Sequence, residues 1–153
     1  MGNRYLFRGK RIDNGKLVVG SLIENVFFRL GQSIPYILCP DKADYDCFED
    51  FTEENGIFEV APSTVCQCTG LRDRKGKLIW ENDIINGSIK RGAAFYRCLV
   101  LWNECKARFD VRTMDCNFPM TLDECTDDIS MSSFDYEVVG NAFDNPELLE
   151  VQE

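Results

Sequence analysis

The sequence predicts a mainly β protein that forms a single domain over residues 1–153, with a bent or barrel-like sheet and one or two short helices. Short runs rich in β-branched and aromatic residues recur along the chain, separated by Gly, Asn and Asp turn signals. The chain shows no strand–helix alternation of the kind that builds a parallel sheet. No repeat or linker divides its 153 residues, a common size for one domain.

Composition limits the compartment and the partners. A content of 44% hydrophobic and 12% aromatic residues is typical of a folded globular protein. No apolar run approaches the roughly 18 residues of a membrane helix, and the first residues show no signal-peptide pattern. We therefore expect a cytoplasmic protein. A net charge of −9 argues against a protein that clamps nucleic-acid phosphates.

The first third of the chain predicts two strand pairs. A strand opens at Tyr5, and Asn14-Gly15 suits a type I′ hairpin turn because both residues tolerate positive φ. Residues 17–23 form the expected return strand, in which Gly20 marks a bulge or a close approach of another backbone. Residues 26–30 and 34–39 predict the second pair.

An acidic segment follows at residues 41–56. Its carboxylates do not follow the calcium-binding loop pattern, because the sixth position lacks the required glycine. We interpret it as an exposed loop whose rings either hold it to the protein body or anchor a protein partner. The rings concerned are Tyr45, Phe48 and Phe51.

Residues 64–85 carry the densest signals. Asp73 to Gly76 predicts a turn, because Asp bonds its own backbone and Gly tolerates positive φ. Residues 78–80 predict a strand, and another begins at Ile84 after the polar corner Glu81-Asn82-Asp83.

Beyond this segment, Asn86-Gly87 reads as a further turn. Strands are expected at residues 93–102, 107–112 and 134–139. Asn145 before Pro146 predicts the start of a short helix, with Asn145 as its cap.

Eight cysteines occur at positions 39, 47, 66, 68, 98, 105, 116 and 125, with no C-x-x-C spacing. Structural zinc sites use thiols two to four residues apart. Cys66 and Cys68 are closer than that and would share one face of a strand. We expect reduced thiols that pack as small apolar groups, with no bound metal.

The chemistry of the chain favours binding over catalysis. Histidine is absent, and neither a nucleophile constellation nor a phosphate loop is recognisable. We therefore expect no catalytic residues and no cofactor. The alternative is a metal-assisted hydrolase in which three carboxylates hold Mg²⁺, namely Asp73, Glu81 and Asp83.

A local basic run surrounds the central turn, and it comprises Arg72, Arg74, Lys75 and Lys77. Such a run is commonly a solvated hairpin tip. It could also contact a nucleic-acid backbone while Trp80 or Trp102 stacks on bases, although the overall acidity opposes this. The same acidity leaves open a protein that mimics DNA.

Four blocks of the chain resemble the YopX family of phage and prophage proteins. They are Phe7–Lys10 with Val19–Leu22, Thr64–Leu71, Asp73–Ile85, and Glu137–Leu148. The chain departs from the family pattern at Cys66 and Asn82, where glycine is expected, and at Cys68. The resemblance implies a mostly β fold and a mobile-element setting, and it implies no activity. We therefore expect a non-enzymatic accessory protein that binds another protein or associates with itself through exposed sheet edges.

Overall fold

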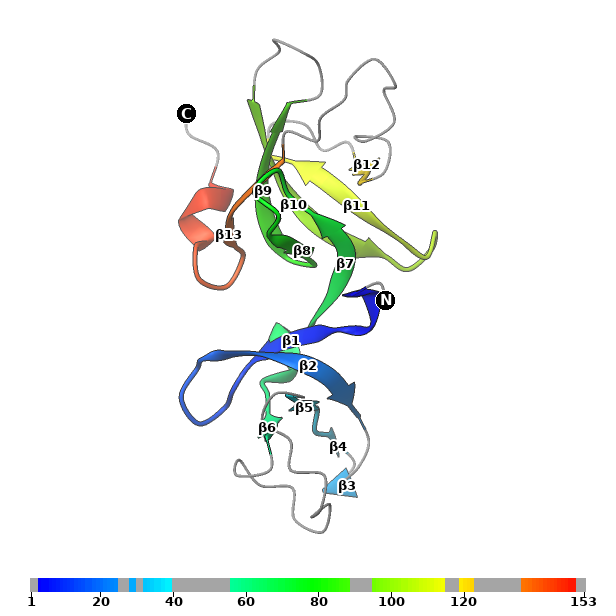
Figure 1. The fold of residues 1–153 in the computed structure, drawn as a ribbon, viewed down its shortest axis with the longest axis vertical. Coiled ribbons are helices and arrows are strands. Elements are labelled where there is room, and N and C mark those ends of the chain that lie inside the picture. Colours follow the sequence, from blue (N-terminus) through cyan, green and yellow to red (C-terminus); the bar gives the residue numbers. More distant parts are fainter. Residues whose placement is uncertain are drawn as a thin grey trace. The chain divides into compact units, whose positions relative to one another are not determined.

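A computed structural model describes residues 3–24, 28–29, 32–39, 56–88, 95–114, 119–122 and 136–150, and the fold is mainly β as predicted (Figure 1). The chain divides into two compact units, Met1–Cys68 and Thr69–Glu153. Each unit contributes antiparallel strands. The described strands form open sheets rather than a closed barrel. The single-domain assignment stays a prediction.

The first unit is an antiparallel sheet with the strand order β6-β5-β2-β1-β7. A separate two-stranded ribbon joins β3 and β4. The strands are β1 (Phe7–Lys10), β2 (Leu17–Ile23), β3 (Phe28–Arg29), β4 (Gln32–Ser33), β5 (Tyr36–Leu38), β6 (Ile57–Glu59) and the start of β7 (Cys66–Arg72).

The hairpin between β1 and β2 forms where the sequence predicts it, with Lys10 opposite Leu17. The turn type differs from the prediction, because only Gly15 takes a positive φ, of 69°. Asn14 instead accepts a hydrogen bond from the Lys16 amide through its side chain, at 2.9 Å. The connection is longer than the two-residue loop of a type I′ turn, so it does not need two residues with positive φ.

Gly20 lies where a neighbouring backbone comes close, as predicted. A Cβ placed on Gly20 would sit 1.9 Å from the Leu38 carbonyl oxygen on β5. The core beside these strands is apolar and includes Ile37, Ile57, Phe58, Val60 and Cys66. Packing of this kind stabilises a small sheet mainly by removing apolar surface from water.

The second unit contains a five-stranded antiparallel sheet with the order β12-β11-β10-β9-β13. Its strands are β9 (Asp83–Ser88), β10 (Phe95–Asn103), β11 (Arg108–Thr113), β12 (Pro119–Thr121) and β13 (Glu137–Asn141). β7 continues into this unit, where β8 (Leu78–Trp80) lies beside it. The core of the unit consists of Ile79, Ile85, Cys98, Val100, Val111, Leu122, Tyr136 and Val138.

The turn predicted at Asn86-Gly87 is wrong. Both residues lie inside β9, where they pair with Arg97 and Tyr96 of β10. Glycine is needed at position 87 because a Cβ there would come within 2.4 Å of the Tyr136 ring. Gly87 therefore allows close packing against Tyr136 and does not mark a turn.

The described helices are all short 3-10 turns: η1 (Asn3–Tyr5), η3 (Pro62–Thr64) and η4 (Pro146–Leu149). The helix predicted after Asn145 exists as η4, but the Asn145 side chain does not cap it. That side chain accepts a hydrogen bond from the Asn141 amide at 3.3 Å instead. Among the described helices, none has the length and apolar character needed to span a membrane.

Candidate functional site

The turn from Asp73 to Lys77 is the most extensively bonded polar feature described in the second unit, and we call it the Asp73 turn. Gly76 takes a φ of 81°, which fits its place in the turn. The Asp73 carbonyl accepts from the Gly76 amide at 2.9 Å, and the Asp73 amide donates to the Lys77 carbonyl at 2.8 Å. The sequence signal of an Asp and a Gly three residues apart is confirmed as a turn.

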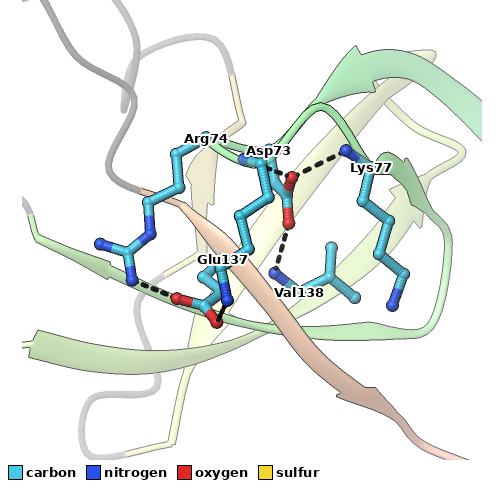
Figure 2. A network of polar contacts seen from close by, with 6 residues as sticks. Asp73, Arg74, Lys77, Glu137 and Val138 are labelled. Atoms are coloured by element: carbon cyan, nitrogen blue, oxygen red, sulfur yellow. Dashed lines mark hydrogen bonds and ion pairs between the residues drawn. The ribbon is translucent and has the colours of Figure 1, made fainter.

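The Asp73 carboxylate is buried and accepts three main-chain hydrogen bonds, two of them from inside the turn. Oδ1 accepts from the amides of Lys75 and Lys77, at 2.9 and 2.8 Å. Oδ2 accepts from the Val138 amide at 3.1 Å (Figure 2). Burial raises the pKa of Asp73, but the amides of Val138, Lys77 and Lys75 outweigh it and hold the pKa below 3.8.

The bond to Val138 places the Asp73 turn against the edge strand of the sheet. β13 is the last strand in the order, so among the described strands it pairs with β9 alone. At this edge the Tyr136 carbonyl accepts from the Arg74 amide at 2.9 Å, and the Val138 amide donates to Asp73. The turn thus supplies one donor and one acceptor where a further strand would pair.

Glu137 adds an ionic contact to the same edge. Its two carboxylate oxygens pair with Arg74 and Lys75, as Figure 2 shows for Arg74. The ammonium of Lys75 and then the guanidinium of Arg74 lower the pKa of Glu137 from 4.5. Both basic side chains are substantially exposed, so solvent and salt screen these pairs.

The four basic residues considered as a possible nucleic-acid contact lie on the Asp73 turn or, for Arg72, directly before it at the end of β7, and all four are exposed. Contacts with other groups of the same chain engage part of this basic run. Arg74 and Lys75 share Glu137, and Arg72 donates to the Gly76 carbonyl at 2.6 Å. The turn therefore presents less positive charge than the sequence run suggests.

The three carboxylates proposed for a metal have other uses in the structure. Asp73 is engaged as described above, and the buried Asp83 accepts from the Trp80 amide at 2.9 Å. Glu81 also makes contacts within the protein. Across the described residues, no group of three or more acidic, histidine or cysteine side chains is arranged to hold a metal ion.

Cys66 and Cys68 lie on one strand, as predicted, and both are fully buried. The five described cysteines are free thiols, namely Cys39, Cys66, Cys68, Cys98 and Cys105. The rings proposed as a partner anchor, Tyr45, Phe48 and Phe51, lie outside the described residues.

Two contributors to the edge were not predicted from the sequence as site residues. Glu137 and the Tyr136 carbonyl lie more than 60 positions from the turn that they contact. The only available signal was that β13 and the turn both fall in blocks shared with one family. A contact at that separation leaves no periodic pattern in a single sequence.

These observations define a mainly β protein whose best-formed polar cluster closes a sheet edge. The model of the YopX protein family matches residues 7–150, and the chain belongs to that family. No curated protein matches the sequence. Asn82, where the family pattern suggests glycine, takes a positive φ of 61°. The local backbone is therefore of the kind that glycine adopts most easily.

Proposed function

We propose that this YopX-family chain is a phage or prophage accessory protein that acts in the cytoplasm by binding a protein, without catalysing a reaction. The observation that carries the proposal is the exposure of large apolar side chains in the first unit. Ile12, Leu17 and Val19 are 57, 41 and 43% exposed. We call these three the hairpin surface. Leu17 and Val19 lie two residues apart on β2 and so share one side of the strand. Apolar groups that share a surface can mark contact sites for proteins.

The bonding of the carboxylates supports binding over the hydrolase alternative. Asp73 uses both oxygens on main-chain amides, so a cation would have to displace bonds that hold the turn to β13. Asp110, also buried, accepts from Asn103 at 2.6 Å and from Arg108 at 2.9 Å. These groups are engaged in maintaining the fold.

Nucleic-acid binding through the Asp73 turn is a weaker alternative, because Glu137 pairs with two of the four cations there and its single negative charge offsets one positive charge. Aliphatic side chains such as those of the hairpin surface also offer no stacking platform for bases. A gel-shift assay at low salt separates this alternative from DNA mimicry, because a protein that mimics DNA does not itself shift DNA. The protein-binding proposal would be overturned if the chain bound DNA and if Arg72→Glu and Lys77→Glu abolished that binding.

The acidic loop remains a second proposed contact region. Tyr45, Phe48 and Phe51 stand among carboxylates, and such rings can anchor an interface. Their joint replacement by Ala separates the two interpretations. A loss of thermal stability would assign the rings to the protein's own core, whereas unchanged stability with lost partner binding would assign them to an interface.

The experiment for the proposed function is affinity capture of the tagged full chain, with identification of retained proteins by mass spectrometry. Leu17→Ser with Val19→Thr removes apolar surface at exposed strand positions. Lys106→Glu with Arg112→Glu is a matched control, because both residues are exposed in the second unit. We expect protein retention by the wild type and the control and its loss in the Leu17/Val19 variant. Identical retention by all three would contradict a role for the hairpin surface.

A further inference from the structure

The dipeptide Asn-Gly occurs three times in the sequence, and the structure describes two of these sites in full. Asn14-Gly15 lies in the connection between β1 and β2, whereas Asn86-Gly87 lies inside β9. The third, Asn55-Gly56, has its asparagine outside the described residues. Asparagine before glycine is prone to deamidation, because glycine has no side chain to shield the main-chain nitrogen that attacks the asparagine amide.

The surroundings of Asn14-Gly15 leave room for this reaction. Both residues are exposed to solvent. Nothing lies within 4 Å of a Cβ placed on Gly15, so a ring that includes the Gly15 nitrogen has space to form. Figure 1 shows the β1–β2 connection extending beyond the strands of the first unit. Water therefore reaches both the amide and the ring that would replace it.

The Asn14 side chain is held against the main chain that would attack it. Its Oδ1 accepts a hydrogen bond from the Lys16 amide at 2.9 Å. This bond spans Gly15 and is of the Asx-turn type, in which the side-chain carbonyl folds back along the chain. The Lys16 amide also polarises that carbonyl and would stabilise the negative charge that develops on Oδ1 during attack.

A second bond in the turn opposes the reaction but is easily opened. The Gly15 amide donates to the Arg11 carbonyl at 3.0 Å, and attack requires the nitrogen to leave this bond and to lose its proton. Gly15 is exposed and lies outside the strands, so water can take the place of the carbonyl at a small cost in free energy.

Asn86-Gly87 places the same dipeptide where the reaction is blocked. Asn86 pairs with Arg97 on β10 and with Glu137 on β13, so strands flank its main chain on both sides. Gly87 is buried, and a Cβ on it would come within 2.4 Å of the Tyr136 ring. Ring closure would have to rotate this peptide out of the sheet. The protein therefore contains an accessible and a protected copy of the same chemistry.

We propose that Asn14 is a site of spontaneous deamidation in the folded protein. The deprotonated Gly15 nitrogen bonds to the Asn14 Cγ, the Cγ–Nδ2 bond breaks, and the amide leaves as ammonia after taking a proton from water. Water then opens the cyclic imide. Attack at Cγ gives aspartate, and attack at the main-chain carbonyl carbon gives isoaspartate. The reaction needs no oxidant or reductant, and water is its co-reactant.

The modification changes the charge and the backbone next to the hairpin surface. Either product places a new carboxylate between Asp13 and Lys16, close in sequence to the exposed Ile12 and Leu17. Isoaspartate also lengthens the main chain of the turn. The inference goes beyond the proposed function and does not depend on it, because the reaction requires only water.

Peptide mapping by mass spectrometry tests the proposal on the full chain, incubated folded at mildly alkaline pH in water enriched in heavy oxygen. Each new carboxylate then carries an oxygen from the solvent, which distinguishes it from an original aspartate. We expect conversion at Asn14 and conversion at least about tenfold slower at Asn86. In urea that unfolds the chain, the two sites should convert at similar rates.

Two glycine variants test the route. Gly15→Ala should slow conversion of Asn14 at least about tenfold, because its methyl group shields the attacking nitrogen. Gly76→Ala is the matched control, since Gly76 also takes a positive φ, of 81°, and a Cβ on it meets nothing within 4 Å. Its Asn14 should convert at the wild-type rate.

Two results would overturn the inference. If Asn14 converts no faster than Asn86 in the folded chain while both convert in urea, the turn protects Asn14. If Gly15→Ala converts at the wild-type rate, the Gly15 nitrogen does not attack and the cyclic imide is not the route.

Discussion

The edge strand β13 of the second unit and the β1–β2 hairpin of the first differ in what they leave accessible. At β13, the Asp73 turn bonds the Tyr136 carbonyl and the Val138 amide. At the hairpin, Leu17, Val19 and Ile12 remain exposed to solvent. The comparison teaches that the polar signals around the Asp73 turn serve the stability of the fold, whereas the proposed contact region consists of apolar residues that the fold leaves exposed.

Edge closure explains why charged residues gather at the Asp73 turn. An uncovered strand edge can pair with another chain, and proteins counter this by covering or charging it. Here one carboxylate replaces a strand carbonyl, and Arg74 and Lys75 meet Glu137 beside it. The basic run therefore has a structural reason that does not require a nucleic acid.

The largest expected effect is that of Asp73→Ala. The substitution leaves the buried Val138 amide and the partly buried amides of Lys75 and Lys77 without their acceptor. Because an unsatisfied buried donor costs about 1–3 kcal/mol, we expect a loss of about 3 kcal/mol or more in the free energy of unfolding. Urea denaturation measures this.

Asp73→Asn serves as the graded control, since its amide oxygen can still accept. Its loss should be smaller than that of Asp73→Ala. Wild-type stability in the alanine variant would show that the turn does not hold β13.

The second prediction concerns the close packing of β2, which carries Leu17 and Val19, against β5. Gly20→Ala would place a Cβ 1.9 Å from the Leu38 carbonyl oxygen if nothing moved. We expect a loss of about 1–3 kcal/mol, typical of overpacking, in urea denaturation. Gly15→Ala is the contrasting variant, because nothing lies within 4 Å of its added Cβ and only its positive φ opposes the change. Equal losses in the two variants would contradict close packing at Gly20.

The third prediction concerns pH. The folded protein holds the pKa of Asp73 below 3.8, so the unfolded chain binds the proton first as the pH falls. Stability from this group is therefore present above about pH 4 and is lost as the pH falls through the folded pKa. Urea midpoints measured between about pH 6 and pH 3 should decrease more steeply for the wild type than for Asp73→Asn. Parallel curves would show that Asp73 is not the responsible group.

The smallest expected effect is that of Arg74→Ala with Lys75→Ala. Both side chains are exposed and their pairs with Glu137 are screened, so the double variant should lose less stability than Asp73→Ala. The difference from the wild type should shrink further in high salt. A loss equal to that of Asp73→Ala would mean that the ion pairs, rather than the buried carboxylate, hold the edge.

Local signals account for the parts of the fold that could be predicted. Residues 17–23 and 78–80 form strands with the expected bounds because each follows a turn encoded by its own residues. Asn86-Gly87 misled because the same glycine can serve a turn or a close contact, and only Tyr136, about 50 residues later, decides between them.

The site was harder to predict than the fold for the same reason. Asp73 was recognised as a turn residue, yet its bond to Val138 spans 65 positions. Asp110 of β11 is another polar residue that is buried, and Asn103 and Arg108 satisfy its carboxylate. A polar side chain is expected to be exposed, but it can be buried where partners from elsewhere in the fold hydrogen-bond it.

Hydrogen exchange at the Val138 amide tests edge closure most directly. Within the described part of the chain, this amide of the edge strand β13 donates to Asp73. Residue-resolved NMR exchange should show a protected Val138 amide in the wild type and rapid exchange in Asp73→Ala. Rapid exchange of Val138 in the wild type, with the neighbouring β9 amides still protected, would contradict edge closure by the Asp73 turn.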